Sequence, residues 1–110
     1  NSSRLKMVRR AIEHINSSQE LNISIPQLAK SCFCSVRSLE YAFKSVLLLT
    51  PKQYLVIRRL HSIKGELLAI DQRNISDVLD KYGIVNAGRF SQDYYQMFGE
   101  YPKQTIKKSG

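Results

Sequence analysis

The sequence predicts an all-α protein of seven helices. Three observations lead to this fold class. Apolar residues recur at helical spacing along most of the chain. Proline and helix-capping residues divide the chain into short segments, and the second half of the chain repeats the first. Strand-like alternation is confined to NISI at 22–25.

Apolar spacing and capping residues together predict where each helix lies. The expected segments are 4–17, 25–32, 36–47, 51–69, 75–82, 87–98 and a short helix from 102 onward. Thr50 and Gln53 form a capping-box pattern around Pro51, which suits the first helical position. Ser24 and Gln27 have a similar arrangement around Pro26, and Asn74 and Asn86 are predicted N-caps.

The two halves of the chain share an internal repeat. Leu39 and Phe90, Phe43 and Tyr94, Leu47 and Phe98, and Pro51 and Pro102 are each separated by 51 positions. Each copy consists of a short helix, a tight turn and a longer helix, which is the layout of a helix-turn-helix. We expect homeodomain-like subdomains at 1–50 and 70–110, joined by a linker helix at 51–69.

The longer helix of each copy has an apolar and a polar face. The predicted buried sides carry Leu39, Phe43, Val46 and Leu47, and Phe90, Tyr94, Met97 and Phe98. The outer sides carry Arg37, Glu40, Tyr41 and Lys44, and Gly88, Arg89, Gln92, Tyr95 and Gln96. Arg, Gln and Glu pair with the edges of guanine, adenine and cytosine in the major groove, while Lys and Tyr reach phosphates. We therefore expect these faces to contact DNA.

The charge of the chain agrees with a polyanionic partner. Seventeen Lys and Arg stand against nine acidic residues, a net charge of +8. An anionic membrane surface and simple solubility are the alternative explanations. No apolar run approaches the roughly 20 residues that span a bilayer, and NSSRLKMVRR leads into no apolar signal region, so we expect no membrane insertion.

Catalytic and metal-binding patterns are missing from the sequence. Cys32 and Cys34, with only His14 and His61, lack the ligand set of a structural zinc site. Asp77 and Asp80 share one helix face, but carboxylates so placed are usually solvated surface charge. We expect no enzymatic activity, no cofactor and no metal.

The helix predicted at 51–69 has a mechanical role in this interpretation. Its length of roughly 27 Å suits a rod that holds two recognition helices about one DNA turn, ~34 Å, apart. Gly65 lies inside it at a cost of up to ~1 kcal/mol relative to Ala. Close packing at Gly65 is the expected reason, with a hinge as the alternative.

Several motifs resemble the DNA-binding domain of the AraC/XylS family of bacterial transcription regulators. YGIVNAGRFSQDYYQMFGEYP resembles the family pattern of Gly, paired aromatics, Phe-Gly and Pro, and SVRSLEYAFK, TPKQYL and RRL match the first half in register. The resemblance covers about residues 5–107. It implies base contacts by Arg37, Glu40, Tyr41, Ala87, Gly88, Arg89 and Gln92, and DNA backbone contacts by Lys44, Thr50, Lys52, Tyr95 and Lys103.

The resemblance also implies partners and location. A double-stranded DNA operator and RNA polymerase are the expected partners. The expected location is the bacterial cytoplasm, with nucleoid association when DNA is bound. We expect a fragment of a longer regulator that lacks an N-terminal sensory domain, or secondly a small stand-alone regulator. A nonspecific nucleic-acid-binding or protein-docking helical module is the alternative function.

The chain departs from the family pattern at several positions. Leu48 stands where a glycine usually ends the first recognition helix, and a left-handed backbone would strain a leucine there, so a different turn is the alternative. Tyr101 replaces a Ser cap. Leu79 and Ile63 replace small residues, which predicts relaxed helix packing or tilted subdomains.

Overall fold

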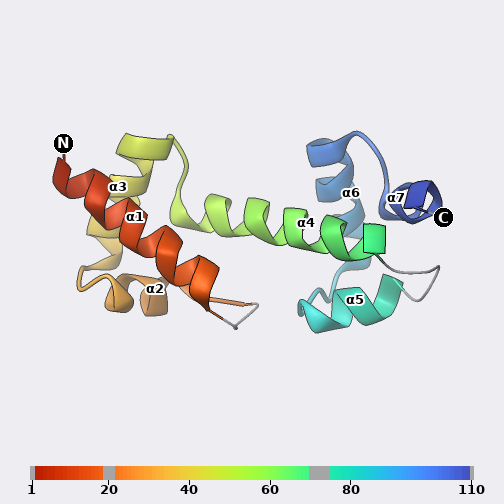
Figure 1. The fold of residues 1–110 in the computed structure, drawn as a ribbon, viewed down its shortest axis with the longest axis horizontal. Coiled ribbons are helices and arrows are strands. Elements are labelled where there is room, and N and C mark those ends of the chain that lie inside the picture. The colour runs from red at the N-terminus through yellow and green to blue at the C-terminus, as the bar shows by residue number, and fades with distance from the viewer. Residues whose placement is uncertain (1, 19–21, 70–74, 110) are drawn as a thin grey trace. The chain divides into compact units, whose positions relative to one another are not determined.

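The chain folds into α-helices in the computed structural model, which describes residues 2–18, 22–69 and 75–109. The helices are α1 (Ser2–Ser17), α2 (Ile25–Ser31), α3 (Val36–Leu47), α4 (Pro51–Ala69), α5 (Ile75–Lys81), α6 (Ala87–Phe98) and α7 (Pro102–Ser109), as Figure 1 shows. The described ranges contain no strand. The predicted fold class is confirmed, and no helix boundary that was predicted differs by more than two residues from the structure.

The predicted caps explain where several helices begin. Ser24 Oγ accepts the N–H of Gln27 at 3.2 Å, and Gln27 Oε1 accepts the N–H of Ser24 at 3.3 Å. The same reciprocal pair joins Thr50 and Gln53 at 3.1 and 2.9 Å. Asn86 accepts the N–H of Arg89 at 3.0 Å. These side chains satisfy backbone donors that a helix start leaves unpaired. The predicted cap Asn74 lies outside the described residues.

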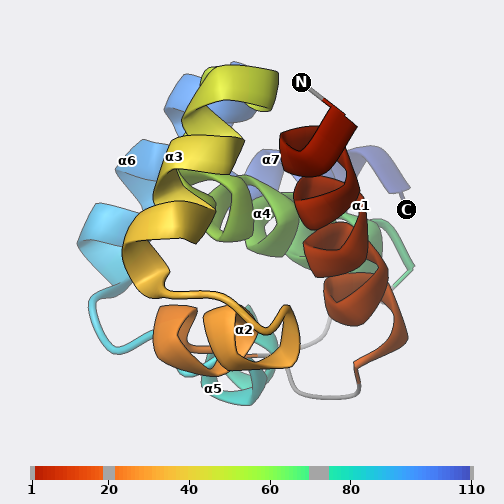
Figure 2. The same ribbon diagram turned by 90° about the vertical axis from the view of Figure 1, so that its left-hand side faces the viewer.

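The first compact unit comprises Asn1–Val56. In this unit α1 packs against α3, and α2 contacts both helices, as can be followed in Figure 2. The buried core side chains come from all three helices and from Cys32: Val8, Ala11, Ile15, Leu28, Ala29, Cys32, Leu39, Ala42 and Phe43. The helical spacing of Leu39 and Phe43 puts both on the buried side of α3, so its opposite side faces solvent.

The second compact unit comprises Ile57–Gly110. Its buried apolar residues come from the later part of α4, from α5 with Tyr82, and from α6: Leu60, Ile63, Leu67, Val78, Leu79, Tyr82, Phe90 and Tyr94. Ile63 and Leu79, which were expected to disturb close helix packing, are 0% and 8% exposed. The core of this unit therefore accommodates both larger side chains.

Three local expectations are changed by the structure. Met97, predicted to be buried, is 38% exposed, because Phe90 and Tyr94 define a narrower buried stripe on α6. Leu48 keeps the left-handed conformation, with φ 62° and ψ 22°, so the alternative of a different turn is wrong. Gly65 is exposed, and a Cβ built there meets no described atom within 4 Å, so close packing does not explain this glycine.

Candidate nucleic-acid interface

The exposed face of α3 carries the predicted side chains of the first unit. Ser35 caps the helix by accepting the N–H of Ser38 at 3.1 Å. Burial of Leu39 and Phe43 then fixes the rotation of the helix, because both side chains are 0% exposed. The predicted base-contact residues Arg37, Glu40 and Tyr41 and the predicted backbone contact Lys44 all lie on the exposed side. The fold thus presents these four side chains to solvent on one helix.

Tyr41 has a partner that the sequence patterns did not indicate. The guanidinium of Arg4, on α1, lies 4.3 Å from the centre of the Tyr41 ring. Arg4 Nη2 also donates to the Tyr41 hydroxyl at 3.3 Å. A guanidinium over an aromatic face is attracted by the ring quadrupole. Arg4 therefore restricts Tyr41 and brings a further positive charge to the exposed face of α3. The two residues are 37 positions apart, so no local motif connects them.

In the second unit α6 has the corresponding exposed face. Asn86 caps the helix, and Ala87, Gly88, Arg89, Gln92 and Tyr95 are all exposed. Beyond the cap, Gly88 leaves its helix surface without a side chain, and the nearest atom to a Cβ built there is Asn86 Oδ1 at 3.6 Å. A partner surface can therefore approach the backbone of α6 closely at this point.

A buried polar group anchors α6 to the end of the chain. The Tyr94 hydroxyl and Thr105 Oγ1 lie 2.6 Å apart in the interior, and Thr105 also donates to a carboxylate oxygen of Glu100. Burial raises the pKa of Tyr94, so its phenol stays protonated and hydrogen-bonded. This contact between α6 and α7 holds the exposed face of α6 in place.

The predicted contacts to the DNA backbone differ in accessibility. Lys44, Lys52, Tyr95 and Lys103 are exposed, whereas Thr50 is half-buried. Thr50 Oγ1 already accepts the N–H of Gln53, and its own hydroxyl proton is still available to a phosphate oxygen. Lys52 and Lys103 follow Pro51 and Pro102 in the first turns of α4 and α7, where helix N-termini favour anions.

The cationic side chains of these faces are not neutralised within the protein. Arg37, Lys44, Lys52, Arg89 and Lys103 form no ion pair with any residue that the structure describes. Among the described residues, the ion pair that is present joins two other side chains, Lys81 of α5 and Glu66 of α4. The positive charges of the predicted faces are therefore free to pair with phosphates.

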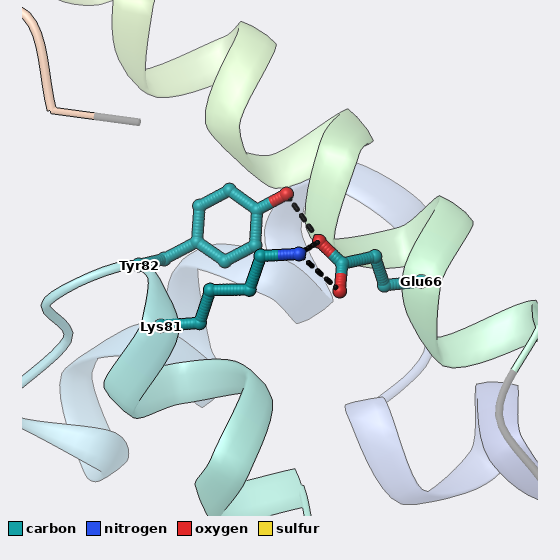
Figure 3. Close-up of polar contacts among 3 residues, drawn as sticks. All are labelled: Glu66, Lys81 and Tyr82. Atoms are coloured by element: carbon teal, nitrogen blue, oxygen red, sulfur yellow. Dashed lines mark hydrogen bonds and ion pairs between the residues drawn. The ribbon is translucent and has the colours of Figure 1, made fainter. Parts of the chain in front are cut away.

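That ion pair belongs to a three-residue contact shown in Figure 3. Lys81 Nζ lies 3.1 Å from both oxygens of Glu66, and the Tyr82 hydroxyl donates to Glu66 Oε2 at 2.5 Å. The hydrogen bond from Tyr82, followed by the contacts with Lys81, holds the pKa of Glu66 below its ordinary value. Burial and the bond to Glu66 raise the pKa of Tyr82 to about 12. This contact ties α5 to α4.

The described residues offer little for other kinds of site. Cys32 is buried and Cys34 half-buried, both as free thiols, in agreement with a packing role. In the ranges that the structure covers, no group of three or more His, Cys, Asp or Glu side chains is placed to hold a metal ion. Within those ranges, too, no helix combines the length and apolar character that crossing a membrane requires.

Two helix-turn-helix units, each presenting a polar and basic helix face, define a DNA-binding protein of the helix-turn-helix class. The family model described as a helix-turn-helix domain matches residues 28–108, most of the chain. The chain therefore belongs to this family, and its relatives and structural neighbours place it among the AraC/XylS-type DNA-binding domains. Domains of this kind bind DNA sequence-specifically in transcription regulation.

Comparison with known proteins supports this assignment. A XylDLEGF operon transcriptional activator of Pseudomonas putida is 34% identical over 101 residues, which cover 90% of this chain and 32% of the relative. A probable thc operon regulatory protein of Rhodococcus erythropolis is 28% identical over 103 residues, covering 92% of this chain and 31% of the relative. The chain thus spans about a third of the length of these curated relatives.

Solved structures have the same fold. The crystal structure of a probable AraC family transcriptional regulator from Rhodopseudomonas palustris is similar with a TM-score of 0.84 and 26% identity, over 94% of this chain and 97% of the other. A transcriptional regulator from Chromobacterium violaceum also has a TM-score of 0.84, at 23% identity, over 100% of this chain and 97% of the other. The second likeness establishes the fold alone.

Proposed function

We propose that α3 and α6 are recognition helices that enter successive major grooves of one double-stranded operator. In this proposal residues 1–50 and 70–110 are the two DNA-binding subdomains, and 51–69 is the helix that joins them. Arg37, Glu40 and Tyr41 read bases for the first subdomain. Ala87, Gly88, Arg89 and Gln92 do so for the second.

The observation that carries the proposal is the recurrence of exposed polar residues at equivalent positions of two helices. Tyr41 and Gln92 are equivalent in the repeat, as are Lys44 and Tyr95, and all four are exposed. Polar residues that are merely solvated would not have to recur at equivalent positions of the two helices. Polar residues on two helices that contact the same DNA molecule would. Phosphate contacts by Lys44, Thr50, Lys52, Tyr95 and Lys103 would set the register of both helices on the duplex.

The relatives support a proposal for the wider role of the protein. The Pseudomonas relative is a transcriptional activator by name, and this chain matches about a third of it. We infer that the chain is the DNA-binding part of a longer, effector-responsive regulator in the bacterial cytoplasm. That regulator would contact RNA polymerase, carry a sensory domain before the DNA-binding part and associate with the nucleoid when bound.

Selection of bound sites from a random DNA pool tests the proposal. We expect one enriched sequence with two half-sites about one helical turn apart. On that sequence, Arg37→Ala and Gln92→Ala should each lose ~1–3 kcal/mol of binding free energy, measured by fluorescence anisotropy. Their loss on random DNA should be much smaller, because a base contact discriminates between sequences.

Two outcomes would contradict the proposal. A pool without any enriched sequence, together with steep salt dependence, would indicate a nonspecific nucleic-acid-binding module instead. Equal losses on the selected site and on random DNA for both variants would assign Arg37 and Gln92 to the DNA backbone rather than to bases.

A further inference from the structure

Two exposed tyrosines stack on each other next to the exposed face of α6. The rings of Tyr95 and Tyr101 lie 4.7 Å apart between centroids, with their planes inclined by 30°. Each residue is 47% exposed. Tyr95 is in the last turn of α6, and Tyr101 immediately precedes α7. The Gly99 N–H donates to the Tyr95 carbonyl at 2.7 Å, so the backbone of Tyr95 is also held.

The equivalent positions of the first unit show what this pair replaces. Tyr95 corresponds to Lys44, and Tyr101 corresponds to Thr50. Thr50 completes a reciprocal capping box, since its hydroxyl accepts the N–H of Gln53. At Tyr101 only half of that arrangement is present. The N–H of Tyr101 donates to Gln104 Oε1 at 2.7 Å, but the N–H of Gln104 donates to the Tyr101 carbonyl at 2.9 Å instead of to a side-chain hydroxyl. The second unit thus has an aromatic ring where the first has a capping hydroxyl.

The replacement of Lys44 by Tyr95 changes how a phosphate contact would work. A lysine ammonium attracts phosphate from many directions through its charge. A phenol hydroxyl is neutral and contributes only when its O–H points at a phosphate oxygen. A tyrosine in this role therefore gains from being held in one orientation before DNA binds, because less side-chain freedom is then lost on binding.

We propose that Tyr101 is a positioning residue, which holds the Tyr95 ring so that its hydroxyl donates to a DNA phosphate beside α6. The inference rests on the proposed function of α6 as a recognition helix. It assigns a role to Tyr101, a residue that belongs to none of the predicted contacts. It also explains why a residue that cannot complete the capping box stands at this position.

Tyr101→Ser separates this role from a structural one, because serine restores the capping hydroxyl and removes the ring. We expect the melting temperature of the 110-residue chain to stay level or rise, as a completed capping box stabilises the start of α7. We expect DNA affinity to fall by about threefold to tenfold. Replacing a residue with only a structural role would not lower DNA affinity while the melting temperature stays level or rises.

Tyr101→Phe is the matched variant, since it keeps the stacked ring without the hydroxyl. Its affinity should stay within about twofold of wild type, whereas Tyr95→Phe should lose as much as Tyr101→Ser. The double variant Tyr95→Phe/Tyr101→Ser should bind no more weakly than Tyr95→Phe alone, because both changes remove one contact. Additive losses in the double variant, unchanged affinity in Tyr101→Ser, or an equally large loss in Tyr101→Phe would each overturn the inference.

The choice of DNA keeps this test separate from the test of the proposed function. A phosphate contact carries no sequence information, so Tyr101→Ser should lose the same factor on the selected site and on a random duplex. Failure to find any preferred sequence would remove the proposed base readout, while the binding of random DNA would still decide the role of Tyr101. Normal base readout with unchanged binding by Tyr101→Ser would overturn only the positioning role.

Discussion

Leu48 and Gly99 have the same left-handed backbone conformation at equivalent helix ends. Leu48 has φ 62° and ψ 22° after α3, and Gly99 has φ 72° and ψ 13° after α6. In both cases the N–H of the capping residue donates to the carbonyl four positions earlier, Lys44 or Tyr95. Both helices therefore end with a residue in the left-handed conformation. In the first unit this residue is a leucine, whose Cβ makes the conformation sterically strained.

Leu48→Gly should stabilise the first unit by about 1 kcal/mol. The left-handed conformation costs a leucine roughly 1–2 kcal/mol, and the greater flexibility of glycine in the unfolded chain offsets part of the gain. The Leu48 side chain is 75% exposed, so little packing is lost. Chemical denaturation measures the change. Leu48→Ala is the control and should give no such gain, because alanine keeps the Cβ that causes the strain.

Phe33→Gly should also stabilise the first unit by relieving left-handed backbone strain. Phe33 has φ 57° in the turn between α2 and α3, where the repeat has Gly83 at φ 70°. Phe33 is 86% exposed, and the Arg10 guanidinium lies 5.9 Å from the centre of its ring. We expect a gain of about 0.5–1 kcal/mol in the free energy of unfolding. A loss of stability would mean that the Phe33 ring contributes more through Arg10 than the strain costs.

Gly65→Ala should stabilise α4 by up to about 1 kcal/mol, because alanine is the better helix former and open space surrounds this position. Thermal unfolding followed by circular dichroism measures the effect. DNA affinity should be unchanged if α4 acts as a rigid connection. Stabilisation with a clear fall in affinity would instead support the hinge alternative at Gly65.

Gly88→Ala is the matched comparison for Gly65→Ala. Both replace an exposed helical glycine, Gly65 in the interior of α4 and Gly88 in the first turn of α6. At Gly88 the nearest atom to the new Cβ, Asn86 Oδ1, is at an ordinary 3.6 Å. Gly88 alone lies on the proposed recognition face. We expect neither variant to lose stability, but about tenfold weaker binding to the selected site for Gly88→Ala only. Unchanged binding would remove close backbone approach as the reason for Gly88.

Arg4→Ala should weaken DNA binding more than the removal of another positive charge from the same helix. Arg4 both stacks on Tyr41 and donates to its hydroxyl, so its loss frees a proposed base-contact side chain. Lys6→Ala is the control, since Lys6 is an exposed cation on α1. We expect about threefold to tenfold loss for Arg4→Ala and less than twofold for Lys6→Ala. Equal losses would reduce the role of Arg4 to its charge.

Tyr82→Phe should destabilise the second unit by about 1 kcal/mol at neutral pH, because Glu66 loses the shortest of its hydrogen bonds from Tyr82 and Lys81. The pKa of Glu66 is lowered in the folded protein, so its contribution is complete above the ordinary value of 4.5 and is lost as the pH falls through the lowered value. The variant should therefore lose less stability on acidification. Denaturation curves between about pH 7 and pH 3 test this.

At alkaline pH the contribution of the Glu66–Tyr82 contact to stability falls as the pH rises, which is the reverse of its dependence at acidic pH. The pKa of Tyr82 is raised to about 12, from an ordinary value of 10.0, so the folded state favours the protonated phenol. Its contribution is complete below the ordinary value and is lost as the pH rises through about 12. Tyr82→Phe should remove this component of alkaline unfolding. An unchanged alkaline profile in the variant would indicate that other groups control it.

Local sequence patterns accounted for most of the fold. Capping boxes at Ser24 and Thr50, prolines at first helical positions and apolar spacing depend on neighbours within four residues, so they can be read without coordinates. The repeat then identified two helix-turn-helix units and the exposed residues of α3 and α6. Met97 was assigned wrongly, because the width of a buried stripe depends on what packs against the helix.

By itself, the sequence predicted seven helices, the caps Ser24, Thr50 and Asn86, the duplicated unit and the exposed polar side chains of α3 and α6. These features follow from the order and spacing of residues along the chain. Only the tertiary structure decided that Leu48 adopts a left-handed backbone, that Arg4 covers Tyr41 and that Tyr101 stacks on Tyr95. The physical reason is that such relations depend on the path of the chain between helices. The path of the chain and the packing of the helices bring together residues whose separation in sequence matches no helical periodicity.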